Sequence, residues 1–330
     1  MKKRLPAGLL AALLLVIASL ALVACGDDDD EGSSSGAAAT ETTGEAASAI
    51  ESNPDNKQVK LTIGSKNFTE QKVLGEIYAQ GLAAAGYTVD TELNLGDEKI
   101  ALKSLKQGDI SAYPEYTGTA LTSFFAIPSD KIPTDPQEAF DQAKIRFVPD
   151  KITALDPTPF TNSNEVGTTQ ETAEKYGLEK ISDLKGKSQE LTLYGTPECR
   201  QRLDCLLGLE KVYGLKFKKF TPVAIDLRHE VLEKGQADLS IVFTTDPQVS
   251  KNNEVLLEDD QQMFPPYNSM LLVRDDVVKE AGPDMPKVIA QVQEGLTDEV
   301  MSELNARVDL DKKTPEQVAG EYLSETGLVE

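Results

Sequence analysis

The chain has 330 residues, of which 40% are hydrophobic and 27% charged, and its formal net charge at pH 7 is −22. This acidic balance argues against nucleic acid as a partner and against non-specific adhesion to anionic lipid, because both carry negative charge. With one histidine and three cysteines, the chain has no metal-binding constellation of credible spacing, so we expect no metal and no cofactor. It also lacks a Walker lysine loop and a Gly-x-Gly-x-x-Gly turn, and no plausible nucleophile–base pair is present, so we expect no enzymatic activity.

The first 25 residues have the organisation of an export signal. Lys2, Lys3 and Arg4 give it a positive start, and an apolar stretch covers residues 9–23. Its end, Leu-Val-Ala-Cys at residues 22–25, matches the bacterial lipobox, in which the signal is cut before the cysteine and the thiol receives a lipid. We therefore predict a lipoprotein signal peptide over residues 1–24 and lipidation of Cys25. A plain secreted protein with an incidental cysteine is the alternative.

Residues 25–58 have the composition of a disordered, acidic tether. Five acids in a row at 27–31 are followed by Ser, Ala, Gly and Thr with scattered glutamates. Such a segment cannot bury enough apolar surface to offset the entropy cost of ordering the chain. Metal binding by the acidic run is a weaker alternative, because disordered carboxylates are not a preformed site.

Residues 59–121 carry the pattern of a βαβ opening. A strand-forming run is followed by apolar residues at helical spacing, and Gly86 ends that helix. The predicted elements are strands over 59–63, 87–95 and 110–113 and helices from about residue 69 and over 98–106.

A tyrosine-rich turn follows the third of these strands: residues 113–119 read Tyr-Pro-Glu-Tyr-Thr-Gly-Thr and open a further short helix. In open α/β sheets, such strand-to-helix turns lie at the carboxyl edge, where small molecules bind. Two interpretations remain open. Tyr113 and Tyr116 are half-buried packing residues, or they help to form a pocket for a ligand with one cationic and one anionic end.

Strands and helices alternate through the rest of the chain, which predicts an α/β protein with mostly parallel sheets covered on both faces. Prolines at 157 and 159 predict an irregular, extended segment over 152–164. The predicted strands cover 191–194, 216–221, 237–243, 255–257 and 269–274. The predicted helices cover 168–176, 203–213, 226–234, 285–295, 298–308 and 315–326, after a mostly helical segment over 130–149.

Cys199 and Cys205 remain after lipidation of Cys25, and outside the cytoplasm two such thiols are expected to form a disulfide. The bridge would either merely stiffen a loop or also hold Arg202 in a position where its planar guanidinium can bind a carboxylate. The single histidine, His229, lies on a predicted helix, and we expect it to be solvated.

Several segments together resemble the substrate-binding proteins of osmoprotectant ABC importers, which bind glycine betaine, proline betaine, choline or carnitine. The first is residues 63–71, Ile-Gly-Ser-Lys-Asn-Phe-Thr-Glu-Gln, and the second is the turn over 113–119. The likeness continues through residues 178–184, 244–246, 257–260, 265–267 and 301–328, and so covers essentially all of 59–330.

The resemblance implies a two-lobed, type II-like periplasmic-binding-protein fold. Each lobe would be a mostly parallel sheet flanked by helices, joined by two crossover strands near 158–164 and 263–268. The implied domains are lobe I over 59–158 plus 268–330 and lobe II over 159–267. Ligand would be trapped between the lobes by hinge closure.

The family places a quaternary ammonium in a box of aromatic rings, since a trimethylammonium cannot donate an N–H hydrogen bond and ring faces attract it. Matched position by position, Tyr116, Phe243 and Tyr267 would form this box, with Asn164 where the family usually has a ring. Tyr113 or Phe160 would then substitute for that ring. The carboxylate end would be held by the polar residues Lys66, Gln71, Thr119 and Arg202.

The resemblance thus implies a solute-binding lipoprotein, anchored outside the bacterial cytoplasmic membrane, that captures a quaternary-ammonium or zwitterionic osmoprotectant. It would deliver this ligand as a monomer to the permease of an ABC importer. Asn164 and Phe243 keep a second hypothesis open, which is the same transport role for another solute such as an amino acid or a polyamine. A lipid-anchored sensor is a further alternative.

Overall fold

The computed structural model describes residues 48–330, so the predicted signal peptide, Cys25 and most of the predicted tether lie outside the described residues. The prediction that the disordered tether extends to residue 58 is wrong for its last residues, which are ordered. Pro54–Gln58 forms a 3₁₀ helix, and the Ile50 amide donates to the Leu328 carbonyl at 2.9 Å. Asn56 is buried and its Nδ2 donates to the Ala85 carbonyl at 2.9 Å, and Ile50 packs against the hydrophobic core, so hydrogen bonds and apolar contacts together order this segment.

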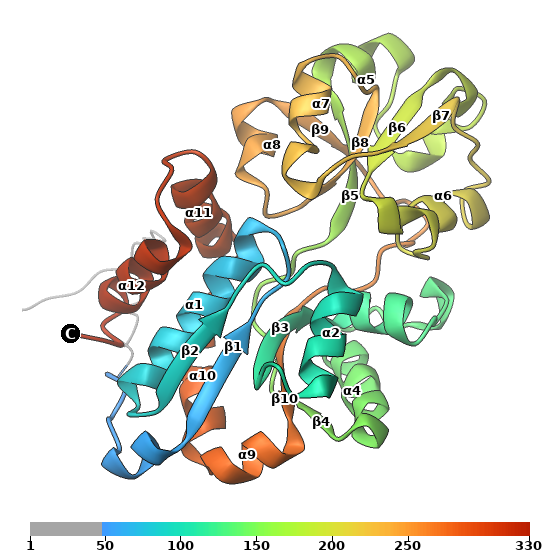
Figure 1. The fold of residues 1–330 in the computed structure, drawn as a ribbon. Helices are drawn as coiled ribbons and strands as arrows, with labels where there is room; N and C mark the ends of the chain where they lie inside the picture. The colour runs from blue at the N-terminus through green and yellow to red at the C-terminus, as the bar shows by residue number, and fades with distance from the viewer. Residues whose placement is uncertain (1–47) are drawn as a thin grey trace, which may run out of the picture. The chain divides into compact units, whose positions relative to one another are not determined.

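Two five-stranded sheets organise the chain (Figure 1). The first contains, in spatial order, β2 (Thr88–Glu92), β1 (Lys60–Gly64), β3 (Ala112–Tyr116), β10 (Ser269–Arg274) and β4 (Ile152–Ala154). The second contains β7 (Lys219–Pro222), β6 (Thr192–Gly195), β8 (Leu239–Phe243), β5 (Asn164–Thr169) and β9 (Glu254–Leu257).

Both sheets are mixed. In the first sheet β10 runs antiparallel to β3 and β4, and in the second β5 runs antiparallel to β8 and β9. β5 and β10 are the strands by which the chain enters a sheet from the other one. The two connecting segments lie side by side, with an antiparallel bridge between Thr161 and Asn268. The sequence did not predict β5, because its first residues follow a proline-rich stretch and are polar.

Helices cover both faces of the first sheet. One face carries α1 (Thr69–Ala84), α10 (Asp284–Glu294), α11 (Asp298–Asp309) and α12 (Pro315–Glu325), and the other carries α2 (Glu98–Gln107) and α4 (Pro136–Phe147). β10 shows why: Leu271 and Val273 belong to the core under α1, whereas Met270 and Leu272 belong to the core under α2 and α4. Successive strand residues point to opposite faces, so a wholly apolar strand buries both.

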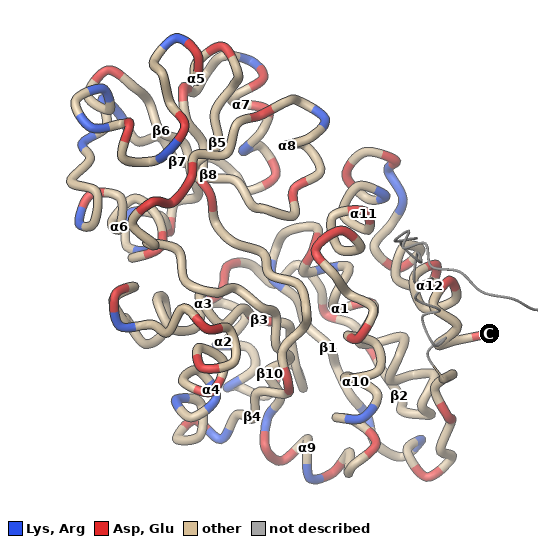
Figure 2. Tube along the Cα trace, turned by 180° about the vertical axis from the view of Figure 1, so that it is seen from behind, with Lys and Arg blue, Asp and Glu red and all other residues tan. Residues whose placement is uncertain are grey.

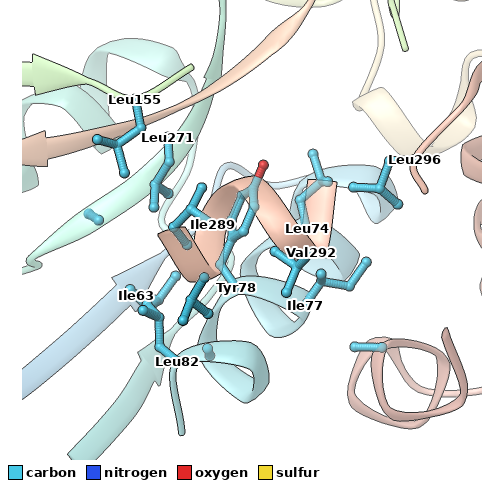
Figure 3. Packing of buried hydrophobic residues seen from close by; sticks show 14 of the residues in the cluster. Ile63, Leu74, Ile77, Tyr78, Leu82, Leu155, Leu271, Ile289, Val292 and Leu296 are labelled. Carbon is cyan, nitrogen blue, oxygen red and sulfur yellow. The ribbon is translucent and has the colours of Figure 1, made fainter. Parts of the chain in front are cut away.

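The core under α1 is dense. Leu74, Ile77, Tyr78 and Leu82 of α1 pack against α10 and the sheet, and each is fully buried (Figure 3). The Tyr78 hydroxyl accepts a hydrogen bond from Gln293 Nε2 at 2.9 Å, which satisfies the polar end of an otherwise apolar ring.

Shorter helices complete the chain. They are α3 (Thr117–Thr119), which continues as a π-helix over Ala120–Phe124, α5 (Gln170–Tyr176), α6 (Leu206–Lys211), α7 (Glu230–Glu233), α8 (Pro247–Lys251) and α9 (Asp275–Ala281). α6 and α7 are shorter than predicted, and β3 extends through Pro114 to Tyr116 because β10 pairs with it over that length. Within residues 48–330, acidic residues occur on helices and loops around both sheets (Figure 2).

Candidate functional site

A cavity of about 380 Å³ lies between the turns of the first sheet and those of the second. From the first sheet it is lined by Lys66, Asn67, Phe68, Asn94, Asp97, Glu98, Tyr116 and Thr119, and from the connecting segments by Asn162, Asn164 and Tyr267. From the second sheet it is lined by residues 196–199, Arg202, Cys205, 223–226, Arg228, Ile241 and Phe243.

Three aromatic rings form one side of this cavity. The Phe68 ring, in the turn between β1 and α1, lies 6.2 Å from the Tyr116 ring and 5.4 Å from the Phe243 ring, measured between centroids. The first pair is nearly parallel, with an interplanar angle of 23°, and the second is tilted by 48°. Tyr116 ends β3 of the first sheet and Phe243 ends β8 of the second. Rings from both sheets therefore meet here.

Two cations of the protein lie over these rings. Lys66 Nζ is 4.6 Å from the Tyr116 centroid, and the Arg228 guanidinium is 4.6 Å from the Phe243 centroid. Both cations are ion-paired with buried carboxylates, Lys66 with Glu115 and Arg228 with Asp246. Burial acts against ionisation of Asp246, but Arg228 and His229 outweigh it and lower the pKa of the carboxyl to about 2.

Glu70, on α1, lies at the hydroxyl end of Tyr116 and is buried. Its carboxylate accepts hydrogen bonds from the Tyr116 hydroxyl at 2.6 Å, Asn162 Nδ2 at 2.8 Å, the Thr245 hydroxyl at 2.6 Å and Asn305 Nδ2 at 2.9 Å. These donors belong to the first sheet, a connecting segment, the turn after β8 and α11. Burial raises the pKa of the Glu70 carboxyl above its usual value, although all four hydrogen bonds oppose the rise.

Asp204, which is fully buried, supports a second part of the cavity wall through Arg202 and Tyr267. Arg202 Nε and Nη2 donate to its two oxygens at 2.9 and 2.6 Å, and the Tyr267 hydroxyl donates to it at 2.5 Å. Burial is the largest single influence and raises the pKa of Asp204, but Arg202, Tyr267 and Thr122 together outweigh it, so the net shift is downward. Arg202 also approaches the first sheet, with Nη2 3.5 Å from the Thr119 hydroxyl and Nη1 3.9 Å from Glu98 Oε2.

Asn164 occupies the position for which the resemblance predicts a ring. Its Nδ2 donates to the Asp204 carbonyl at 3.0 Å and lies 3.4 Å from the Tyr267 hydroxyl. Asn164 thus supports the Asp204–Tyr267 contact and does not present a ring face. Gly118 allows Tyr267 to pack closely against the turn after β3, because a Cβ at that position would lie 2.7 Å from the Tyr267 ring.

The structure brings seven of the nine predicted ligand-binding residues to the cavity wall: Lys66, Tyr116, Thr119, Asn164, Arg202, Phe243 and Tyr267. Tyr113 and Gln71 are fully buried and are not among the lining residues. Tyr113 donates to Glu115 Oε2 at 3.1 Å within the core under α2 and α4. Gln71 accepts from the Lys66 amide at 3.3 Å, and its Nε2 has no hydrogen-bond partner among the described residues. Phe160 is also buried in the core and is not among the lining residues.

Sequence reasoning missed three cavity residues that change its chemistry: Phe68, Glu98 and Arg228. Phe68 stands in the Ser-Lys-Asn-Phe-Thr segment, two residues after the predicted Lys66, and this proximity was the one available signal. Arg228 was hidden because it adjoins His229 on a predicted surface helix.

His229 is buried, contrary to the prediction of a solvated side chain. Its ring nitrogens lie 2.8 Å from Asp246 Oδ2 and 2.8 Å from Glu254 Oε2. Burial lowers the pKa of the imidazole, but hydrogen bonds to the two carboxylates raise it above its usual value overall. The histidine therefore supports Asp246, which in turn holds Arg228.

Cys199 and Cys205, which line the cavity, form a disulfide with a Cα–Cα distance of 5.0 Å. Within residues 48–330 no three His, Cys, Asp or Glu side chains are grouped to hold a metal ion. In the same part of the chain, no helix has the length and apolar character needed to cross a bilayer.

Comparison with known proteins identifies the family. The model described as "Substrate binding domain of ABC-type glycine betaine transport system" matches residues 59–325. A glycine-betaine-binding protein of Pseudomonas aeruginosa is 32% identical over 281 residues, which cover 82% of this chain and 89% of that protein. An ergothioneine transport permease/ergothioneine binding protein of Helicobacter pylori is 29% identical over 85% of this chain, but the chain spans only 49% of that protein's length.

A solved structure of a glycine betaine/carnitine/choline ABC transporter superposes with a TM-score of 0.65 at 25% identity, covering 82% of this chain and 100% of that one. The two-lobed α/β fold implied by the sequence resemblance is thereby confirmed, and the first and second sheets are its two lobes. The resemblance itself is confirmed as well. The chain belongs to the family of substrate-binding domains of ABC-type glycine betaine transport systems.

Proposed function

We propose that this protein captures a small solute with a quaternary-ammonium head in the cavity between its lobes and delivers it to the permease of an ABC importer. The observation that carries the choice of ligand is the group of rings Phe68, Tyr116 and Phe243, drawn from both lobes. A trimethylammonium cannot donate an N–H hydrogen bond, and ring faces attract it by about 0.5–2 kcal/mol each, depending on desolvation. Tyr267 adds a fourth ring to the wall, and Phe68 takes the part expected of a ring at position 164.

The residues around Asp204 would hold the other end of the solute. Arg202 Nη2 and the Thr119 hydroxyl come from different lobes and lie 3.5 Å apart, so a polar group adjacent to both would contact both lobes at once. Lys66, which lines the cavity, remains a candidate for the same end from the β1–α1 side, whereas Gln71 is fully buried and does not line the cavity. Contacts to both lobes favour closure, because a ligand shifts a two-state equilibrium only through differential contacts with the two states.

We further propose that the chain is anchored outside the cytoplasmic membrane and is divided into a signal peptide, a tether and two lobes. Residues 1–24 would be a signal peptide, Cys25 would carry a lipid, and an acidic segment would tether lobe I (59–158 and 268–330) and lobe II (159–267) outside the cytoplasmic membrane. The protein would act as a monomer with no catalytic step. Labelling with a radioactive fatty acid tests the anchor, which predicts incorporation into the wild type and none into Cys25→Ser.

Calorimetric titration of the purified protein with glycine betaine and choline tests the ligand class. We expect micromolar binding of at least one of them, lost in Tyr116→Ala and Tyr267→Ala. Tyr113→Phe is the matched control, because this buried tyrosine does not line the cavity, and it should bind as the wild type does. Absence of binding by folded wild-type protein would reject a quaternary-ammonium ligand.

A second candidate is the same transport role for a different small solute, such as an amino acid or a polyamine. It is favoured by Lys66 and Arg228, which already lie over the Tyr116 and Phe243 rings and compete for their faces. A thermal-shift screen of amino acids, polyamines and quaternary amines separates the two candidates, since only the first predicts that trimethylated compounds give the largest shifts.

A further inference from the structure

The start of α2 is a natural site for a ligand carboxylate, and it is already used by the protein. A helix N-terminus presents free amides and a positive dipole end, which attract anions. Asp97, which lines the cavity, caps this helix and accepts hydrogen bonds from the amides of Lys99 at 3.0 Å and Ile100 at 2.9 Å. A carboxylate of the solute would therefore meet a carboxylate of the protein at this end of the cavity.

Arg202 is likewise engaged. Asp204 accepts hydrogen bonds from Nε and Nη2 of the Arg202 guanidinium. Nη1 of Arg202 is directed towards the first lobe, 3.9 Å from Glu98 Oε2. Glu98 is the first residue of α2, is only 4% exposed and accepts a hydrogen bond from the Ser123 hydroxyl at 2.6 Å. Its carboxylate lies where an anionic end of a solute would have to approach Arg202.

The charge balance of the cavity points the same way. Three bases line it, Lys66, Arg202 and Arg228, against four acids, Asp97, Glu98, Glu198 and Asp226. Each of the three bases is also paired with a further carboxylate, from Glu115, Asp204 and Asp246, so negative charges exceed positive ones by four. Burial acts to raise the pKa of Glu98, but Arg202, Ser123 and Lys66 together lower it, which keeps this carboxyl ionised at neutral pH.

We infer that the solute carries a net positive charge, with a quaternary ammonium at one end and a neutral hydrogen-bonding group at the other, and that Glu98 enforces this choice. The inference rests on the proposed function and narrows its substrate class from zwitterions to cations. A neutral hydroxyl or amide can donate to Glu98, which lines the cavity, whereas a carboxylate there is repelled by it. Like-charge juxtaposition of this kind is a common device for excluding a competing ligand.

Two ligands of the same shape test this directly: glycine betaine, and its amide, in which the carboxylate becomes a carboxamide and the net charge becomes positive. We expect the amide and choline to bind wild-type protein about tenfold more tightly than glycine betaine, a ratio set by charge repulsion at a buried site. Glu98→Gln should reduce this preference at least about fivefold by improving glycine betaine binding. Asp109→Asn, an exposed position beyond the other end of α2, is the control with the same loss of charge and should keep the ratio.

The outcomes are distinguishable. Glycine betaine binding as tightly as its amide overturns the inference while leaving the proposed function intact. A preference for the amide that is equal in wild type, Glu98→Gln and Asp109→Asn overturns the role of Glu98. Failure of all three ligands to bind folded wild-type protein rejects the proposed function itself. The comparison of ligands on wild-type protein decides the charge class even if Glu98→Gln does not fold.

Discussion

The carboxylate of Glu70 in α1 and the hydroxyl of Thr245 after β8 share a hydrogen bond of 2.6 Å that joins the two lobes. The same carboxylate accepts from Tyr116 in lobe I, 2.6 Å away, and from Asn162 in a connecting segment. A single buried group thus holds both the Tyr116 ring of lobe I and the turn after Phe243 of lobe II. It couples the geometry of the ring group to the relative position of the lobes.

Glu70→Gln is expected to destabilise the protein at acidic pH by about 1–3 kcal/mol, because the amide nitrogen of glutamine cannot accept the hydrogen bonds that an oxygen accepts. This cost should shrink as pH rises. The folded pKa of Glu70 lies above its usual 4.5, so the folded wild type binds a proton more strongly than the unfolded chain and loses stability as pH rises through that interval. Urea unfolding of both proteins between pH 4 and pH 8 measures the difference, and an advantage of the wild type that grows with pH would contradict the assignment.

The stability effect of His229→Gln should depend on pH in a similar way to that of Glu70→Gln, but here the group that is lost is a cation held by carboxylates. The folded pKa of His229 lies above 6.5, because Asp246 and Glu254 stabilise the protonated ring more than burial disfavours it. Its contribution is therefore fully present below pH 6.5 and is lost as pH rises through the folded pKa. We expect the wild type to exceed the variant in unfolding free energy by about 1–3 kcal/mol at pH 6 and by less at pH 9. In Glu254→Gln this pH dependence should weaken, and an unchanged profile there would show that another group titrates.

The sequence predicted those site residues that lie in local motifs, and it missed features that depend on contacts distant in sequence. Tyr116 and Lys66 were predicted because they stand in contiguous segments with recognisable motifs. Tyr116 ends β3 and Lys66 closely follows β1, and both line the cavity. β5 was missed, because its Asn-Glu-Val-Gly-Thr-Thr run has no clear alternation, and its place is set by pairing with β8 and β9. His229 was predicted to be solvated because Asp246 and Glu254, whose carboxylates hydrogen-bond to its ring, lie far away in sequence.

Removing the disulfide with Cys199→Ser and Cys205→Ser should affect both stability and binding. Closing so short a loop is worth about 2 kcal/mol through the entropy of the unfolded chain. The loop also carries Arg202, so we expect weaker binding of the same ligand in the double variant, measured by calorimetry beside thermal unfolding. Treatment of the wild type with a reductant should reproduce both changes. Full affinity in the reduced protein would mean that Asp204 alone positions Arg202.

Phe68→Leu tests the ring that the sequence did not predict. Leucine keeps an apolar side chain of similar size but removes the ring face between Tyr116 and Phe243. We expect affinity for a quaternary-ammonium ligand to fall by about 0.5–2 kcal/mol, while the free energy of unfolding changes by less than about 1.5 kcal/mol. Phe160→Leu is the matched control, because this ring is buried in the same core but does not line the cavity, and it should lower stability without weakening binding. Equal loss of affinity in the two variants would mean that Phe68 acts through packing alone, and unchanged affinity in Phe68→Leu would remove it from the binding site.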